Sequence, residues 1–142
     1  MSIDGLGQED IRRVLTETKR VAVVGASDKP HRPSFGVLNY LVQQGYDVTA
    51  VNPGIAGKSI GGRPVVASLA EAGPLDMVDV FRASDQVAPV VDEAIRLGAT
   101  TIWMQLGVVD EDAAARARAA GLTVVMDRCP AIEGPRLGMG RH

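Results

Sequence analysis

The stretch VAVVGASDKPHRPSFG, residues 21–36, decides the fold that we expect for this chain. Its first four residues are apolar and prone to form a strand, and Gly25 follows them directly. A polar loop that contains two prolines then leads into residues 34–44, whose apolar positions have helical spacing and end before Gly45. A buried strand, a glycine turn and a helix in this order begin a nucleotide-type α/β domain.

The same alternation continues along the chain. We expect strands at 21–24, 46–53, 75–82, 99–107 and 122–129, helices at 8–19, 34–44, 84–97 and 110–120, and a short strand or turn followed by a short helix within 64–73. Pro89 leaves the first residue of the third of these helices open. Apolar strands joined by helices form a parallel sheet that is covered on both faces. We therefore predict one domain, 1–142, with the α/β class and a Rossmann-like, doubly wound, mostly parallel sheet of about five or six strands with helices on both faces.

The charge composition argues against some classes of partner. The chain has 15 Lys and Arg against 17 Asp and Glu, a net charge of −2, and no long run of one sign. This balance argues against nucleic acid or a membrane surface as the partner. The sequence shows no apolar stretch long enough for a membrane span and no signal-peptide pattern, and its one cysteine cannot form an internal disulfide. We therefore expect a cytoplasmic protein.

The carboxyl ends of the strands are where a doubly wound fold binds its ligand. At the end of the first strand, Gly25 allows a tight turn and a close approach of the backbone to a ligand, Ala26 is small, and Ser27 offers a hydroxyl. The amino terminus of the next helix, near Ser34, attracts anions to the same place. The loop between them adds three cationic or titratable side chains: Lys29, His31 and Arg32. We interpret this as a phosphate or pyrophosphate site; the alternative is an ordinary loop that faces water.

The second strand ends in Asn52 and Pro53. A dinucleotide fold expects G-x-G-x-x-G after the first strand and an acidic residue here, and both are absent, which argues against NAD. The chain also lacks the G-x-x-x-x-G-K-[ST] of a P-loop. Asn52 and Pro53 either end the strand or border an adenine or ribose. Lys58, in a glycine-rich loop, either reaches another phosphate or is a solvated surface charge.

The third strand ends in Phe81 and Arg82 and also carries Asp76 and Asp79. We expect the aspartates to end or flank this strand and to make local contacts. Arg82 either pairs with one of them or contacts a ligand phosphate.

The fourth strand ends in Gln105, Leu106 and Gly107. Gln105 is a candidate hydrogen-bond partner for a ligand, or it satisfies backbone groups, while Gly107 serves the turn. Trp103 in the same strand is expected in the core. After the fifth strand, Cys129 is interpreted as a small buried residue; a thiol at the mouth of the site is the alternative.

Taken in order, these motifs resemble a known family, the small single-domain CoA-binding proteins, which are similar to the CoA-binding domain of the succinyl-CoA synthetase α subunit. The matching pieces are VAVVGASDKPHRPSFGVLNYLVQQGYDVTAVNP, DMVDVFR, IWMQLGV and GLTVVMDRC, and the resemblance covers residues 12–137. It implies that coenzyme A or an acyl-CoA lies along the carboxyl edge of the sheet. The residues carried over fall into five groups: Gly25, Ala26 and Ser27 at the pyrophosphate; Asn52 and Pro53 beside the nucleotide; Phe81 and Arg82 on the adenosine side; Gln105, Leu106 and Gly107 along the remaining edge; and Arg32, Ser34 and Lys58 as further contacts.

The absence of a catalytic set decides between functions. The chain has two histidines, His31 and His142, and shows no metal-ligand spacing and no G-x-S-x-G motif. Neither histidine is placed like the phosphorylated histidine of the synthetase, so ligase activity is not carried over. We expect a non-catalytic carrier, sensor or accessory module for CoA. The alternatives are a small enzyme, either an oxidoreductase or an acyl-CoA-linked one with Cys129 at its site, and a subunit of a ligase-type complex. A homo-oligomer and a mixed disulfide between Cys129 and CoA also stay open.

Overall fold

A seven-stranded sheet forms the centre of the computed structural model, which describes residues 3–140; His142 lies outside this range. The strands are β1 (Arg20–Val24), β2 (Asp47–Val51), β3 (Ser59–Ile60), β4 (Arg63–Val66), β5 (Met77–Val80), β6 (Thr101–Met104) and β7 (Thr123–Val125), in the spatial order β3-β4-β2-β1-β5-β6-β7. All neighbours are parallel except β3 and β4, which form an antiparallel hairpin at one edge. The predicted fold class is confirmed, and β3, only two residues long, brings the number of strands above the expected one.

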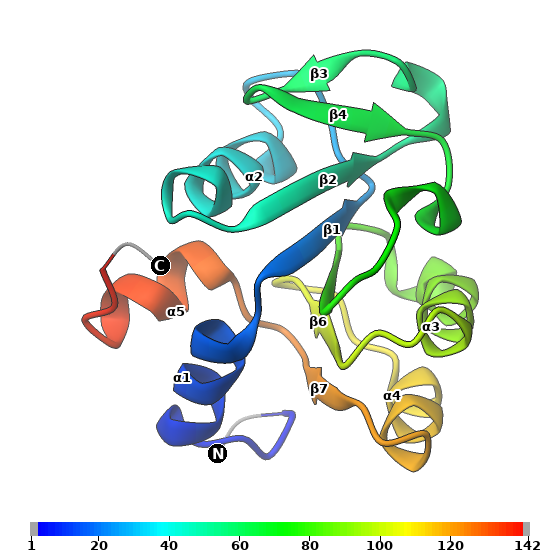
Figure 1. The fold of residues 1–142 in the computed structure, drawn as a ribbon. Coiled ribbons are helices and arrows are strands. Elements are labelled where there is room, and N and C mark those ends of the chain that lie inside the picture. The colour runs from blue at the N-terminus through cyan, green and yellow to red at the C-terminus, as the bar shows by residue number, and fades with distance from the viewer. Residues whose placement is uncertain (1–2, 141–142) are drawn as a thin grey trace.

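Helices cover both faces of the sheet, as Figure 1 shows. They are α1 (Gln8–Glu17), α2 (Pro33–Gln43), α3 (Val87–Arg96), α4 (Glu111–Ala119) and α5 (Pro130–Arg136), with short 3-10 turns at Pro53–Ile55, Leu69–Ala72 and Ser84–Gln86. Helices α3 and α4 lie on one face, and α1, α2 and α5 lie on the other. The last of these 3-10 turns precedes α3, so Pro89 falls in the first turn of the helix, where a proline is tolerated.

The core is divided by the sheet into two layers. In β1, Ala22 and Val24 face the layer under α3 and α4, whereas Val21 and Val23 face the layer under α1, α2 and α5. Side chains of successive strand residues point to opposite faces, so a strand that is apolar throughout supplies both layers. Trp103 is fully buried in the second layer, which confirms its place in the core.

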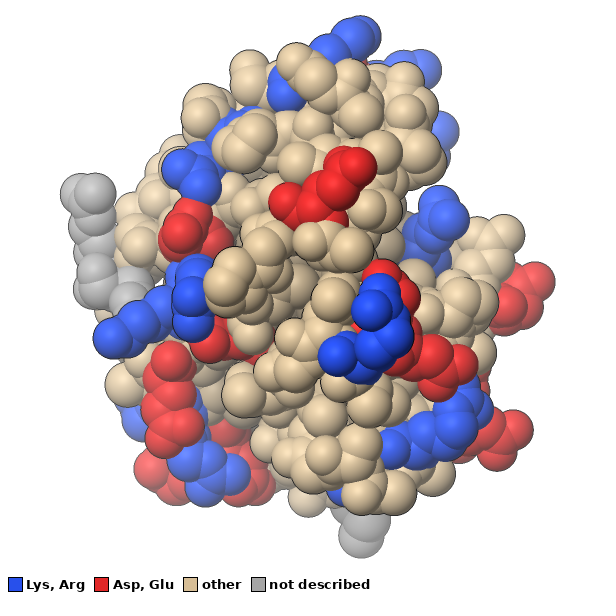
Figure 2. Space-filling model, turned by 45° about the vertical axis from the view of Figure 1, so that its right-hand side comes forward, with Lys and Arg blue, Asp and Glu red and all other residues tan. Residues whose placement is uncertain are grey.

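Charged side chains lie on the surface of the domain. Figure 2 turns the face of α3 and α4 toward the viewer, and there positive and negative side chains neighbour one another. Two ion pairs belong to these helices: Arg96 with Glu93 at 2.6 Å and Arg116 with Asp92 at 3.0 Å. Among residues 3–140, every helix is too short or too polar to cross a bilayer.

Candidate ligand-binding site

The point where the strand order reverses lies between β1 and β5. From β1 the chain continues to β2 on one side, and from β5 it continues to β6 on the other, so the carboxyl ends of β1 and β5 border the crevice of a doubly wound sheet. The Gly25 N–H donates to the Val51 carbonyl at 3.1 Å, and the Phe81 N–H donates to the Val24 carbonyl at 2.8 Å. Hydrogen bonds thus hold the ends of three strands together.

Gly25 is required at this junction by its geometry. Its φ is +84°, and a Cβ at this position would lie 2.3 Å from the carbonyl oxygen of Phe81. An L side chain rarely adopts this φ, and the backbone of β5 leaves no room for one. The glycine therefore allows the ends of β1 and β5 to approach each other below the crevice.

A cavity of about 590 Å³ opens above this junction. Ten predicted residues line it: Gly25, Ala26, Ser27, Arg32, Ser34, Asn52, Phe81, Arg82, Gln105 and Leu106. Five further residues line it: Lys29, which the phosphate-type loop was expected to contribute, Cys129, whose thiol was the alternative at the mouth of the site, and the unpredicted Pro33, Val37 and Val108. Of these, Val37 belongs to the apolar stripe of α2 that the sequence shows, and Lys29 to the loop that it singled out.

Positive charge is concentrated in this cavity. Lys29, Arg32 and Arg82 line it, and none of the described aspartates and glutamates does. Within residues 3–140, none of the three has an ion-pair partner; in particular Arg82 pairs with neither Asp76 nor Asp79. Three cations without a carboxylate form an electropositive site in a chain whose net charge is −2.

The amino terminus of α2 faces the same cavity. Arg32 is the N-cap residue and its side chain makes no capping hydrogen bond, Pro33 is the first helical residue, and Ser34 is buried beside the cavity. The Ser27 hydroxyl accepts from the Lys29 N–H at 3.1 Å, which shapes the loop that leads to the helix. Backbone N–H groups and the helix dipole at such an end favour a bound anion.

Asn52 fastens the end of β2 to this loop. Its Nδ2 donates to the Ala26 carbonyl at 2.8 Å, and its Oδ1 accepts from the Gly54 N–H at 2.8 Å. The side chain therefore serves the strand end and the turn, while the residue also lines the cavity. An aspartate could accept from Gly54 but could not donate to Ala26, so the neutral amide suits this position.

Asp79 lies within β5 and not at its end, contrary to the expectation from sequence. It is fully buried, and its neighbours in register are Val23 of β1 and Trp103 of β6. With its amide nitrogen turned toward this carboxyl group, Gln105 donates to Asp79 Oδ1 at 2.9 Å and to Oδ2 at 3.3 Å. Burial raises the pKa of Asp79 well above its usual value. Asp79 thus supports Gln105 from beneath the cavity that Gln105 lines.

Three predicted residues are not among those lining this cavity. Pro53 lines a second cavity, of about 340 Å³. Gly107 serves its turn, since its N–H donates to Asp127 Oδ1 at 2.7 Å. Lys58 forms an exposed ion pair with Asp28 at 3.6 Å. His31 is exposed in the loop before α2 and lines neither cavity.

The second cavity adjoins the first because Gly25, Asn52 and Arg82 line both. Most of its remaining lining is apolar: Val24, Val51, Pro53, Ala67, Leu69, Pro89 and Val90, with Ser68 and Glu93 as polar members. A charged first cavity and a mostly apolar second one therefore meet at the reversal of strand order.

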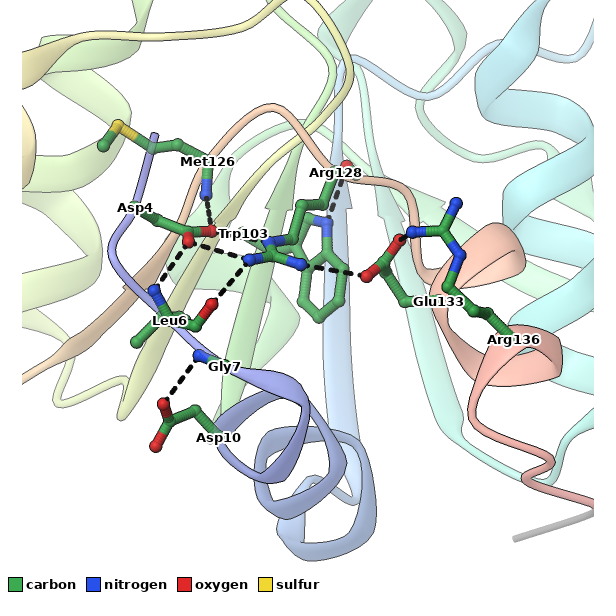
Figure 3. A network of polar contacts seen from close by, with 9 residues as sticks. All are labelled: Asp4, Leu6, Gly7, Asp10, Trp103, Met126, Arg128, Glu133 and Arg136. Carbon is green, nitrogen blue, oxygen red and sulfur yellow. Dashed lines mark hydrogen bonds and ion pairs between the residues drawn. The ribbon is translucent and has the colours of Figure 1, made fainter. Parts of the chain in front are cut away.

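Cys129 lines the first cavity and is buried. A polar network around Arg128 holds the segment after β7 in place, as Figure 3 shows. The Arg128 guanidinium pairs with Asp4 at 2.8 Å and with Glu133 at 3.0 Å, and the indole nitrogen of Trp103 donates to the Arg128 carbonyl at 2.9 Å. These contacts tie the N-terminal segment and α5 to the end of β7.

Together, the doubly wound sheet and a cationic cavity at its reversal point define a small Rossmann-like domain that is suited to a phosphate-bearing ligand. The family described as "CoA binding domain" matches residues 19–135, and the chain belongs to this family.

Named relatives share this architecture. The chain is 40% identical over 121 residues to the uncharacterized protein YneT of Bacillus subtilis (strain 168). The match covers 84% of this chain and 88% of the relative. A hypothetical protein from Pyrococcus horikoshii OT3 has a TM-score of 0.91 at 38% identity, over 96% of both chains. A Thermus thermophilus protein has a TM-score of 0.87 at 35% identity, over 93% of this chain and 99% of the other. A structure described as RSP in complex with beta-NADH shares the fold alone, at 17% identity and a TM-score of 0.55, over 83% of this chain and 58% of the other.

Proposed function

We propose that this chain binds coenzyme A or an acyl-CoA across the carboxyl edge of its sheet and acts as a carrier, sensor or accessory module. One observation carries the proposal. Lys29, Arg32 and Arg82 line a cavity without carboxylates at the amino terminus of α2. Membership of the CoA binding domain family supports the choice of coenzyme A among phosphate-bearing ligands.

The ligand would lie along the two adjoining cavities. Its diphosphate would sit between Ser27, Arg32 and the first turn of α2, where backbone N–H groups and cations neutralise it. Its adenosine part would occupy the second cavity, against Pro53, Leu69 and Val90. Arg82 lines both cavities and would reach a phosphate at their junction. The pantetheine arm would then run past Gln105 toward Leu106 and Cys129.

A binding role fits the side chains at the site. None of the described residues that line the first cavity carries a carboxyl group, and Gln105 stands between the cavity and the carboxyl group of Asp79. General acid–base catalysis needs such a group within hydrogen-bond reach of the reacting atom.

Titration calorimetry with CoA, NAD and NADP tests the proposal. We expect CoA to bind and Arg82→Gln to weaken it by about 10- to 100-fold, because a hydrogen bond to a charged group is worth about 1.5–3 kcal/mol. Arg118→Gln, at an exposed position of α4 that lines neither cavity, is the matched control. Binding of NAD without binding of CoA would reject the proposal. Mass spectrometry of small molecules released from the purified protein gives an independent readout.

A second function, turnover of an acyl-CoA at a thiol, has one observation in its favour, since Cys129 lines the cavity. Cys129→Ala separates the two functions. If the variant binds CoA as tightly as the natural sequence but loses a turnover found by substrate screening, the enzyme alternative gains. An unreactive Cys129 toward thiol reagents in the folded protein excludes it.

A further inference from the structure

We infer that a groove beside α5 receives the acyl group of an acyl-CoA, and that it favours an uncharged aliphatic chain over one that ends in a carboxylate. This inference rests on the proposed function and names its ligand class. The α5 groove has a volume of about 370 Å³. It is lined by Ile3, Leu106, Met126, Asp127, Arg128, Cys129, Ile132, Glu133 and Arg136.

The first argument is continuity. Leu106 and Cys129 line both the first cavity and the α5 groove, just as Gly25, Asn52 and Arg82 line both the first and the second cavity. The three spaces therefore follow one another along the carboxyl edge, from the side of β2 and β4 to that of β7 and α5. A CoA whose adenosine part lies in the second cavity directs its sulfur toward Leu106 and Cys129. The groove is the space that follows.

The second argument is exposed apolar surface. Among residues 3–140, the large hydrophobic side chains that stay exposed are Ile3 at 55%, Leu106 at 55% and Ile132 at 41%, and all three border this groove. Exposed aliphatic side chains that gather at one cavity indicate a surface that is covered when a ligand binds. An aliphatic acyl chain matches them in chemistry.

The third argument concerns charge. Arg128 pairs with Asp4 at 2.8 Å and with Glu133 at 3.0 Å, and Arg136 pairs with Glu133 at 3.1 Å. Figure 3 shows that these side chains point toward one another. Both arginines at the groove thus already have carboxylate partners. Asp127 adds a further negative charge at the rim. An acyl group that ends in a carboxylate would meet repulsion here without a free cation.

Titration calorimetry with a series of thioesters tests the inference. We expect acetyl-, butyryl- and hexanoyl-CoA to bind with rising affinity, by up to about fourfold for each buried methylene, while succinyl-CoA binds no tighter than CoA. Ile132→Asn should abolish this gain and leave the affinity for CoA unchanged. Ile132 is exposed, so the variant should fold, and Ile3→Asn provides a second test at another exposed position of the groove. Ala115→Asn, at an exposed position of α4, is the matched control.

Each alternative outcome has a distinct meaning. Equal affinities for CoA and all acyl-CoAs would overturn the inference and leave the proposed function intact. The same conclusion would follow if Ile132→Asn kept the rise in affinity with the length of the acyl chain. Tighter binding of succinyl-CoA would overturn the preference for an uncharged chain. A dimer that dissociates in Ile132→Asn, with no discrimination between thioesters, would assign the apolar surface to a second copy of the chain. Failure of CoA itself to bind would reject the proposed function and the inference with it.

Discussion

Replacement of Gly25 by alanine tests whether the approach of β1 to β5 sets the geometry of the site. The residue has a φ of +84°, and a left-handed conformation costs an L residue about 1–2 kcal/mol. The new Cβ would also lie 2.3 Å from the Phe81 carbonyl oxygen, which belongs to the backbone and cannot rotate away. Overpacking of this kind costs about 1–3 kcal/mol. We expect Gly25→Ala to lower the free energy of unfolding by about 2–5 kcal/mol.

Gly98→Ala is the matched control because it separates the two costs. Gly98 follows α3 with a φ of +81°, and a Cβ there would have no neighbour within 4 Å among the residues described. Alanine at this position therefore incurs the backbone cost alone, about 1–2 kcal/mol. The difference between the two variants measures the contact with Phe81.

The assay is urea unfolding followed by the fluorescence of Trp103, the only tryptophan, which is fully buried. Linear extrapolation gives the free energy of unfolding of each variant. CoA titration of Gly25→Ala completes the experiment, because a shifted β5 would displace Arg82. A loss in Gly25→Ala no larger than that in Gly98→Ala would refute the argument that the close approach constrains this junction.

Three other variants test charges within the fold by the same unfolding measurement. Burial raises the pKa of Asp79, so the folded state retains a proton that the unfolded state releases, and the free energy of unfolding should fall as the pH rises above about 4. Asp79→Asn should remove this dependence on pH. An unchanged dependence would contradict the raised pKa of Asp79. Burial alone would raise the pKa of Asp76, but hydrogen bonds from the N–H groups of Arg20 and Lys19 hold this pKa below its usual value. Asp76→Ala should lower the free energy of unfolding by about 1–3 kcal/mol at pH 7, and this loss should shrink as the pH falls through the folded-state pKa of Asp76. Arg128→Met removes the guanidinium group from the buried Asp4 carboxylate and leaves Glu133 with Arg136 as its ion-pair partner, and it should cost about 3–5 kcal/mol, part of which the double variant with Asp4→Asn recovers. Equal stability of the single variant and the natural sequence would disprove a structural role for the pair of Arg128 and Asp4.

The sheet and most of the site could be predicted because both depend on short-range patterns. Apolar runs indicate the strands, and a parallel topology brings the carboxyl ends of the strands to one edge of the sheet whatever the conformation of the loops. That is why Ser27, Arg82 and Gln105, which are far apart in sequence, line one cavity. Helix α5 was not predicted because Pro130, Gly134 and Pro135 are poor helix formers. It packs against α1 and α2, and a Cβ at Gly134 would lie 2.3 Å from the Tyr40 hydroxyl oxygen, so that Tyr40 would have to move. The ion pair of Lys58 with Asp28 could not be predicted because nothing in this loop indicates that pairing.

The part of the site that the sequence does not reveal depends on partners far apart in the chain. Asp4 and Arg128 are separated by 124 positions, and no local pattern links them. Yet this pair joins the segment before α1 to the segment after β7, and so brings Ile3 to the side of Leu106 and Ile132. The first and second cavities are built by strand ends that topology alone places together. The α5 groove includes Ile3, which this ion pair holds beside it, so the shape of the groove should be more sensitive to Arg128→Met than the cationic cavity is.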